Sequence, residues 1–383
     1  MFERSLQLPG PKGPTFFLWG PRQTGKSTLL KAAFPDARRI DLLKSEEFRR
    51  YTEEPERLRQ ELLANESDTR FVVIDEVQRV PALLNEVHWL IENAGVHFAL
   101  CGSSARKVRR GHANLLGGRA LRYELFGLVS KEIGRGFDLR RALNHGYLPR
   151  HYESDRPARL IQSYVADYLK DEIAAEGIVR NLPAFSVFLS VASLSDAEMV
   201  NFSNIGRECG VSSHTAQSYF EILTDTMLGR WIPAYRKRPK RRIVQSPKFY
   251  FADVGVVNFL AKRKDLEPGS ELFGKAFENW VCHELAAYSS YSETLAELSY
   301  FRLTSGVEVD FVINDMQLAV EAKATRKVTT DHLKGLRELA HDHPEIKNRV
   351  LVCLETTERR TPDGIHIIPA LGFCKKLWAG HWF

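Results

Sequence analysis

The sequence predicts an α/β protein built from several domains, and three observations support this. The chain has 383 residues, 44% hydrophobic and 27% charged, which is enough for roughly two or three domains that each bury a core. Apolar strand-like runs alternate with helical stretches over roughly residues 1–130, which is typical of a parallel sheet. Helical patterns dominate over 131–195, and roughly the last 110 residues mix strands and helices again.

Composition disfavours several classes of protein. No apolar run approaches the ~18–20 residues needed to cross a bilayer, and the first residues, MFERSLQLPG, lack the apolar core of a signal peptide. The five cysteines are scattered and form no C-x-x-C pair, which argues against a disulfide framework or a zinc knuckle. These are Cys101, Cys209, Cys282, Cys353 and Cys374. We therefore expect a reduced, cytoplasmic protein with no membrane partner.

A phosphate-binding loop is predicted near the N-terminus. The string GPRQTGKS, residues 20–27, fits the G-x-x-x-x-G-K-[ST] pattern and lies between a strand-like run and a helical stretch. Gly20 and Gly25 let consecutive N–H groups face one anion, and the positive end of the helix points there too. Lys26 would contact the β- and γ-phosphates of ATP, and the Ser27 hydroxyl would ligate Mg²⁺. The predicted nucleotide-binding residues are Gly20, Pro21, Arg22, Gln23, Thr24, Gly25, Lys26, Ser27, Thr28 and Ser103.

An acidic pair ends a second buried strand. The run RFVVIDEV carries Asp75 and Glu76 where its apolar stretch stops. Unpaired carboxylates are costly to bury, so we expect Asp75 to hold Mg²⁺ through water and Glu76 to polarise the attacking water. The alternative is that both carboxylates simply lie in solvent. Ser103 and Ser104 end a third strand, VHFALCGSS, where a hydroxyl could reach the γ-phosphate, although small residues commonly end strands.

Four segments in order, GPRQTGKS, VVIDEVQRVP, CGSSARK and LLGGRALRYELFGL, resemble the AAA+-type ATPases of the prokaryotic archaeal-ATPase group. The resemblance implies a P-loop AAA+ parallel sheet with a helical lid, and an arginine that reaches a γ-phosphate, often in a neighbouring subunit. Arg119 matches that arginine and Arg106 is a second candidate, although an arginine beside glycines could be an ordinary loop residue. Action of Arg119 on a neighbouring subunit would make the protein a homo-oligomer.

A helix-turn-helix pattern occupies residues 204–228. Apolar residues recur at helical spacing on both sides of Gly210, and Ser212 is placed to cap the second helix. The run RKRPKRR, residues 236–242, places six cations in seven positions where a winged helix has its wing. We expect both features to contact duplex DNA; a solvated charged face and a protein-binding module are the alternatives. The predicted DNA-binding residues are Ser213, His214, Gln217, Arg236, Lys237, Arg238, Lys240, Arg241 and Arg242.

The segment GVEVDFVINDMQLAVEAKATRK predicts a β-hairpin with a two-residue turn at Asn314–Asp315. The predicted pairs, all apolar and on one face, are Ile313 with Met316, Phe311 with Leu318, Val309 with Val320, and Val307 with Ala322. On the other face Glu308 would lie opposite Glu321, with Asp310 diagonal to it and Lys323 nearby. Opposed carboxylates repel, so they would favour a hard divalent ion, Mg²⁺ or Mn²⁺. A surface hairpin with a wet outer face is the alternative.

Asp310, followed eleven residues later by Glu321-x-Lys323, resembles the PD-(D/E)xK nuclease superfamily, although Val309 stands where the proline of the motif would be. The resemblance implies a restriction-endonuclease-like α/β domain in which Asp310 and Glu321 hold the metal and Lys323 activates water or stabilises the pentavalent phosphate. The upstream helix FGKAFENWVCHELAAY carries Glu278, where many members place a further metal ligand. Some domains of this kind keep the fold without cutting.

The predicted organisation has four parts. They are a P-loop AAA+ ATPase core at 1–130, a helical lid at 131–195, a winged helix at 196–265 and a nuclease-like domain at 266–383. The predicted function is ATP hydrolysis that controls DNA engagement, or cleavage by a Mg²⁺- or Mn²⁺-dependent endo- or exodeoxyribonuclease. One alternative is an ATP-dependent DNA-binding switch with an inactive nuclease fold. The other is a protein-binding regulator related to defence.

Overall fold

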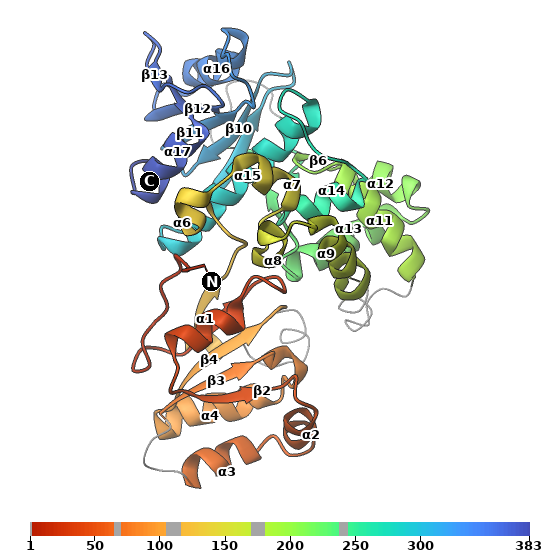
Figure 1. The fold of residues 1–383 in the computed structure, drawn as a ribbon, viewed down its shortest axis with the longest axis vertical. Coiled ribbons are helices and arrows are strands. Elements are labelled where there is room, and N and C mark those ends of the chain that lie inside the picture. Colours follow the sequence, from red (N-terminus) through yellow and green to blue (C-terminus); the bar gives the residue numbers. More distant parts are fainter. Residues whose placement is uncertain (1, 65–69, 105–115, 170–180, 237–243) are drawn as a thin grey trace. The chain divides into compact units, whose positions relative to one another are not determined.

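The computed structural model describes residues 2–64, 70–104, 116–169, 181–236 and 244–383 (Figure 1). Its internal contacts divide the chain into two compact units. One unit is Arg4–Phe126 with Asp225–Leu228, called the nucleotide unit below. The other consists of residues 127–224 and 229–383 with the first three residues, and is called the C-terminal unit. The finer division into four domains stays a prediction.

A five-stranded parallel sheet forms the centre of the nucleotide unit, in the order β2-β3-β4-β1-β5. The strands are β1 (Phe16–Trp19), β2 (Arg38–Asp41), β3 (Phe71–Asp75), β4 (His97–Gly102) and β5 (Leu121–Glu124). β1 and most of β3 and β4 are buried, because helices cover the sheet and leave little room for polar side chains. The parallel-sheet α/β core predicted for this part of the chain is confirmed.

The helices of the nucleotide unit alternate with its strands. They are α1 (Lys26–Ala33), α2 (Ser45–Glu53), α3 (Arg57–Ala64) and α4 (Leu83–Ala94), with short 3₁₀ turns η1 (Val77–Arg79) and η2 (Leu116–Gly118). Because the strands are parallel, the segments that follow β1, β3 and β4 meet at one edge of the sheet. The predicted phosphate loop, the acidic pair and Ser103 occupy these three segments.

The first part of the C-terminal unit is mostly helical. Its elements are α6 (Ser130–Ile133), η3 (Gly134–Gly136), α7 (Leu139–His145), α8 (Pro149–Glu153), α9 (Pro157–Ser163), η4 (Tyr164–Leu169), α11 (Leu182–Leu194), α12 (Phe202–Glu208), α13 (Ser213–Asp225) and α14 (Val254–Leu260). Three short strands, β6 (Glu198–Met199), β7 (Gly229–Ile232) and β8 (Lys248–Phe251), pair antiparallel in the order β6-β8-β7. Aromatic rings of Phe220, Trp231 and Phe249 pack together and join α13 to this sheet.

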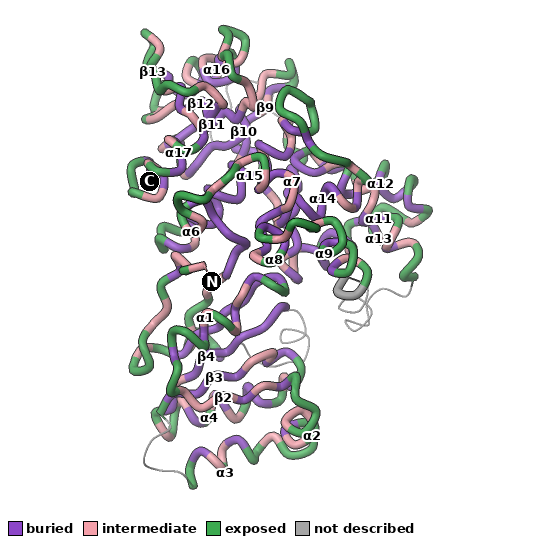
Figure 2. The backbone as a smooth tube through the Cα atoms, viewed as in Figure 1, coloured by how far each residue is buried: buried purple, intermediate pink, exposed green. Residues whose placement is uncertain are grey.

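The last part of the C-terminal unit is a mixed six-stranded sheet in the order β13-β14-β12-β11-β10-β9. Its strands are β9 (Leu298–Arg302), β10 (Glu308–Ile313), β11 (Leu318–Ala322), β12 (Asn348–Cys353), β13 (Arg359–Arg360) and β14 (His366–Pro369). Its helical elements are α15 (Glu271–Tyr291), η5 (Asp331–Leu333), α16 (Lys334–Asp342) and α17 (Ala370–Trp378). Figure 2 shows buried backbone running through β10, β11 and β12, because α15 and α17 pack on one face and α16 on the other.

The predicted pairing of the β10–β11 hairpin is wrong by two residues. Phe311 pairs with Val320 and Ile313 with Leu318, so a four-residue loop replaces the two-residue turn. Asn314 has the positive φ that the prediction required, but Met316 also has one and is fully buried. Burial of Met316 against the face that carries α16 explains the longer loop. Both faces of this sheet are therefore apolar, whereas the prediction placed all eight apolar residues on a single face.

All five cysteines are buried and free. Within the described parts of the chain, no helix is long and apolar enough to span a membrane.

Candidate functional sites

The phosphate loop has the backbone conformation that its glycines permit. Gly25 caps α1 with a φ of 94°, and a Cβ atom on Gly20 would lie 2.4 Å from the carbonyl oxygen of Leu125. The Lys26 side chain is buried and curls back over the loop, where its Nζ donates to the carbonyl oxygens of Gly20 (2.7 Å) and Pro21 (2.9 Å). The loop therefore holds one ammonium group beside the N-terminus of α1, where an anion is favoured.

The remaining predicted loop residues differ in their burial. Thr24 is buried and its Oγ1 donates to Pro21 O at 2.9 Å. Ser27 is half-buried in the first turn of α1, whereas Arg22, Gln23 and Thr28 are exposed. The positive charges of Lys26 and Arg22 both act on the carboxylate of Glu76, so the loop and the acidic pair share one electrostatic environment.

Glu76 occupies an unusual backbone conformation next to the loop. Its φ of 57° and ψ of 43° are left-handed, which is uncommon for a residue with a side chain. Burial raises the pKa of its carboxyl group and Asp75 raises it further, while Lys26, Arg22 and a hydrogen bond from Gln78 oppose the rise. Asp75 accepts the backbone N–H of Glu76 at 3.1 Å. The structure thus brings Lys26, Asp75 and Glu76 together, as predicted for a nucleotide site.

Gln78 links Glu76 to Ser103 and was missed by the sequence analysis. Its Nε2 donates to Glu76 Oε2 and lies 3.0 Å from the Oγ of buried Ser103. Its Oε1 is buried without a hydrogen-bond partner among the described residues. Position 102 requires a glycine, because a Cβ atom on Gly102 would lie 2.3 Å from Gln78 Oε1. The only sequence signal was a glutamine two positions after the acidic pair.

Arg4 is a second residue that sequence reasoning missed. Its guanidinium group donates to the carbonyl oxygens of Thr24 (2.5 Å) and Phe126 (2.7 Å). These bonds join the phosphate loop to the end of the segment that follows β5. No motif marks this arginine, because its two acceptors lie 20 and 122 residues away in the sequence.

Arg119 lies away from the phosphate loop of its own chain. It precedes β5, whereas the loop follows β1, and the two strands are parallel neighbours, so the residues occupy opposite edges of the sheet. Its exposed guanidinium group pairs with Glu92 on α4. A contact with the γ-phosphate of the same chain is therefore excluded by topology, and action on a neighbouring subunit stays a prediction. The second candidate, Arg106, lies outside the described residues.

The helix-turn-helix pattern corresponds to α12 and α13. Gly210 in the turn has a φ of 66°, and the Ser212 hydroxyl accepts the N–H of Thr215 at 3.1 Å, which confirms the predicted cap. The predicted DNA-facing residues Ser213, His214 and Gln217 are exposed on α13. Arg236 is also exposed, whereas the other predicted cations, Lys237, Arg238, Lys240, Arg241 and Arg242, lie outside the described residues.

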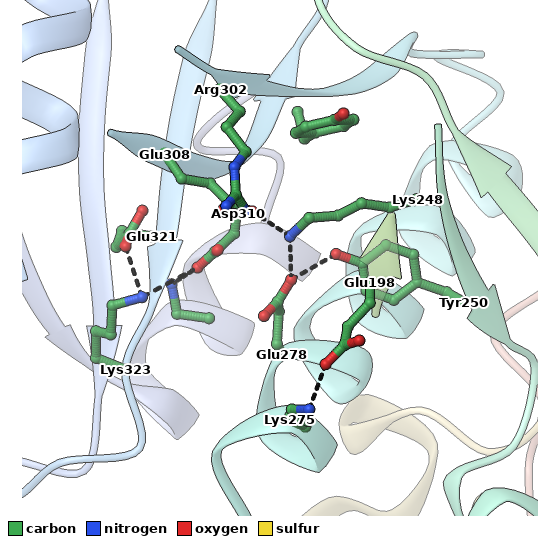
Figure 3. Close-up of polar contacts among 12 residues, drawn as sticks. Glu198, Lys248, Tyr250, Lys275, Glu278, Arg302, Glu308, Asp310, Glu321 and Lys323 are labelled. Carbon is green, nitrogen blue, oxygen red and sulfur yellow. Dashed lines mark hydrogen bonds and ion pairs between the residues drawn. The ribbon is translucent and has the colours of Figure 1, made fainter. Parts of the chain in front are cut away.

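The predicted catalytic residues of the C-terminal sheet converge. Continuing the observed pairing places Asp310 opposite Glu321, in place of Glu308. Lys323 Nζ lies 2.6 Å from Glu321 Oε1 and 3.7 Å from Asp310 Oδ2, and the Asp310 carboxylate accepts the Ala322 N–H at 2.8 Å (Figure 3). Burial and the charge of Asp310 raise the pKa of Glu321 to about 8. Burial disfavours the charged form of Lys323, but the two carboxylates outweigh it and raise its pKa.

A second ion cluster adjoins these residues and is centred on Lys248 at the start of β8. Its Nζ lies 2.9 Å from Glu278 Oε1 and 2.5 Å from Glu308 Oε1, and its side chain is only 4% exposed. Tyr250 donates to the same oxygen of Glu278 at 2.6 Å, and Arg302 donates to Glu308 Oε2 at 2.6 Å (Figure 3). The sequence contained Lys248 only as the first residue of an apolar strand, so nothing indicated a buried cation.

The carboxylates fit a divalent ion only in part. In the described portion of the chain, no group of three or more His, Cys, Asp or Glu residues is arranged to hold a metal. The pair Asp310 and Glu321 is compatible with Mg²⁺, which is commonly held by one or two carboxylates with water completing its shell. Glu321 Oε2 is buried and has no hydrogen-bond partner among the residues that the structure describes, which suits such a ligand. Glu278 is engaged by Lys248 and Tyr250, so its predicted role as a metal ligand gains no support from its contacts.

Three protein families match consecutive parts of the chain. Residues 12–134 match the AAA domain, residues 136–267 match a domain of unknown function, DUF8612, and residues 273–373 match a second domain of unknown function, DUF4143.

Curated relatives cover most of the chain. The uncharacterised proteins Mb2031c of Mycobacterium bovis and Rv2008c of Mycobacterium tuberculosis are each 26% identical over 314 residues, which is 79% of this chain and 68% of theirs.

Solved structures with local likeness include the Orc1 protein of Aeropyrum pernix in complex with DNA and the replication initiator DnaA bound to AMPPCP and single-stranded DNA. The first is 13% identical with a TM-score of 0.23, covering 65% of this chain and 87% of that one. The second is 15% identical with a TM-score of 0.27, and the match covers 55% of this chain and 82% of that one. TM-scores this low do not indicate a shared overall fold. Residues 12–134, which contain the phosphate loop, are therefore similar to the AAA domain, in agreement with the predicted P-loop ATPase core.

Proposed function

We propose that the protein hydrolyses ATP in its nucleotide unit and uses the nucleotide state to control the binding of duplex DNA by its C-terminal unit. The proposed ATP hydrolysis is supported by one observation: Lys26, Asp75 and Glu76 lie close together at one edge of a parallel sheet. Lys26 would bind the β- and γ-phosphates, and Ser27 and Asp75 would hold Mg²⁺, which neutralises phosphate charge when bound. Glu76 would orient the attacking water and accept its proton.

The DNA-binding half of the proposal is supported by α13. Its inner face packs into the aromatic cluster, while Ser213, His214 and Gln217 are exposed with short or planar polar side chains. Such side chains can hydrogen-bond base edges when a helix enters the major groove. Cations in the following basic run would add phosphate contacts and salt dependence.

Steady-state ATPase assays with and without duplex DNA test the proposal. Glu76→Gln should abolish hydrolysis while ATP still binds, since the amide cannot accept the proton. Gln217→Glu should weaken DNA binding through repulsion of phosphates, whereas the control Gln60→Glu adds the same charge at an exposed position of α3 and should bind normally. Equal DNA affinity of the two charge variants would exclude α13 as the DNA-facing helix.

A second activity, metal-dependent phosphodiester cleavage, is favoured by the convergence of Asp310, Glu321 and Lys323. Asp310 and Glu321 would hold the divalent ion, which activates water when bound. Lys323 would remain cationic beside them and stabilise negative charge on the phosphate.

Incubation of the protein with supercoiled, linear and single-stranded DNA in Mg²⁺ or Mn²⁺ tests this activity. Glu321→Ala should remove cleavage, and Asp331→Asn, an exposed carboxylate of η5, should retain it. Cleavage that survives Glu321→Ala would assign the activity elsewhere. DNA binding without any cleavage would favour a switch with an inactive nuclease fold, and absence of both would favour a protein partner.

A further inference from the structure

Lys248 is a buried cation supplied to the carboxylates of the C-terminal sheet by a strand outside that sheet. It begins β8, which pairs with β6 and β7 in the three-stranded sheet. The ammonium group nevertheless contacts Glu278 on α15 and Glu308 on β10, and it lies 5.5 Å from the centre of the Tyr300 ring. An ammonium group this deeply buried is stable only if carboxylates compensate it.

The carboxylates that contact Lys248 also accept hydrogen bonds from other side chains. Glu278 Oε1 accepts from both Lys248 and Tyr250, and the two oxygens of Glu308 are divided between Lys248 and Arg302. Asp310 also attracts Lys248 electrostatically, so the ammonium group lies amid three carboxylates. By contrast, Glu321 Oε2 is buried, and no described residue forms a hydrogen bond with it.

The charges in this part of the structure leave room for a single divalent ion. Among the described residues that join this network, the carboxylates are Glu278, Glu308, Asp310 and Glu321, and the cations are Lys248, Arg302 and Lys323. Four negative and three positive groups give a net charge of −1 if all are ionised. One divalent ion changes this to +1, whereas a second would give +3 in a buried site, which is strongly unfavourable.

We propose that the Lys248 ammonium group serves as a fixed cation between Glu278 and Glu308, in the place that a second divalent ion would otherwise take. The centre then binds a single divalent ion, between Asp310 and Glu321. This inference rests on the proposed metal-dependent activity of the same residues. Lys248 also links the proposed metal site at Asp310 and Glu321 to β8. Displacement of β8 would therefore remove a positive charge from beside Asp310.

Metal binding tests the inference without measuring cleavage. Calorimetric titration with Mn²⁺ in the absence of nucleotide should give about one Mn²⁺ per wild-type chain and about two for Lys248→Met. The methionine removes the cation between Glu278 and Glu308, so that the oxygen that each carboxylate directs at Lys248 can act as a ligand. Mn²⁺ should also raise the thermal midpoint of Lys248→Met more than that of the wild type. Lys275→Met is the matched control, since Lys275 lies on α15, the helix that carries Glu278, but pairs with Glu198 and Glu271. It should behave as the wild type.

The outcomes separate the inference from the function on which it rests. If wild type binds one ion, Asp310→Asn loses it, and Lys248→Met still binds only one, the inference is overturned while the metal site stands. If wild type binds no Mn²⁺, both are overturned.

A Lys248→Met chain that folds only with Mn²⁺ would support the inference. If it stays unfolded with Mn²⁺ while Lys248→Met/Glu308→Gln folds, then a metal ion cannot replace the ammonium group and the inference fails.

Discussion

Replacement of Gln78 by leucine removes the hydrogen bond that Gln78 donates to the proposed general base, together with its contact to Ser103. The Gln78 amide donates to the carboxylate of Glu76 and lies within hydrogen-bond distance of Ser103. That hydrogen bond favours the ionised form of Glu76, whose pKa is raised by burial. Leucine has a similar size but no donor, so Gln78→Leu should raise the pKa of Glu76 further.

The magnitude follows from the charge of the acceptor. A hydrogen bond to a charged group contributes ~1.5–3 kcal/mol, and ~1.4 kcal/mol corresponds to a factor of ten. At pH values where Glu76 is partly protonated, ATP hydrolysis by Gln78→Leu should therefore be about 10- to 100-fold slower than that of the wild type. The free energy of unfolding should not fall much, because Gln78 Oε1 is buried with no hydrogen-bond partner in the described part of the chain, and its removal relieves a desolvation cost.

The assay is the pH dependence of kcat together with thermal unfolding. The acid limb of the profile should move to higher pH in Gln78→Leu, and the rates should approach those of the wild type above the limb. Gln60→Leu, an exposed substitution on α3, should leave the profile unchanged. An unshifted acid limb in folded Gln78→Leu would refute the assignment of Glu76 as a base tuned by Gln78.

Three further predictions concern stability and nucleotide binding. Burial raises the pKa of Glu284 from 4.5 to about 7. Between these pH values the folded chain retains a proton that the unfolded chain releases. The free energy of unfolding should therefore fall by about 3 kcal/mol as pH rises from ~4.5 to ~8. In urea titrations, the free energy of unfolding of Glu284→Gln should not show this decrease with pH. A difference in free energy between Glu284→Gln and the wild type that stays the same at every pH would contradict the prediction. Asp253 accepts three backbone N–H groups at 2.6, 3.1 and 3.0 Å, so Asp253→Ala should cost about 3 kcal/mol or more, and a loss below ~1 kcal/mol in urea unfolding would be inconsistent with these bonds. Gly20→Ala would place a Cβ 2.4 Å from a carbonyl oxygen and should weaken ATP binding on the order of tenfold or more, measured with a fluorescent analogue. The control Gly10→Ala, which has open space around the new Cβ, should bind ATP normally.

Local motifs were predicted well because their chemistry is contained in a few consecutive residues. GPRQTGKS specifies its own turn and helix start, and the β-branched apolar run FVVID predicted the buried strand that ends at Asp75. The cap at Ser212 likewise depends on a hydrogen bond that spans three residues. The match to the AAA domain agrees with this local reading.

Pairing and long-range partners were predicted less well. The hairpin register depended on whether Met316 ended the turn or was buried, and burial against α16 decided it. A shift of two residues preserves the alternation of side chains, so the apolar pattern alone could not distinguish the two pairings. The same shift replaced Glu308 by Asp310 as the partner of Glu321.

The sequence by itself determined the phosphate loop, the acidic pair, and the presence of Asp310 and Glu321 in two adjacent strands with Lys323 directly after the second, because these depend on residue type and short spacing. Only the tertiary structure decided that Arg119 lies at the opposite sheet edge from the loop, that Gln78 contacts Glu76, and that Lys248 fills the space between two carboxylates. These contacts join segments whose separation in space is set by sheet order and helix packing. A buried charge selects its partners through the free energy of desolvation, which depends on the whole surrounding structure.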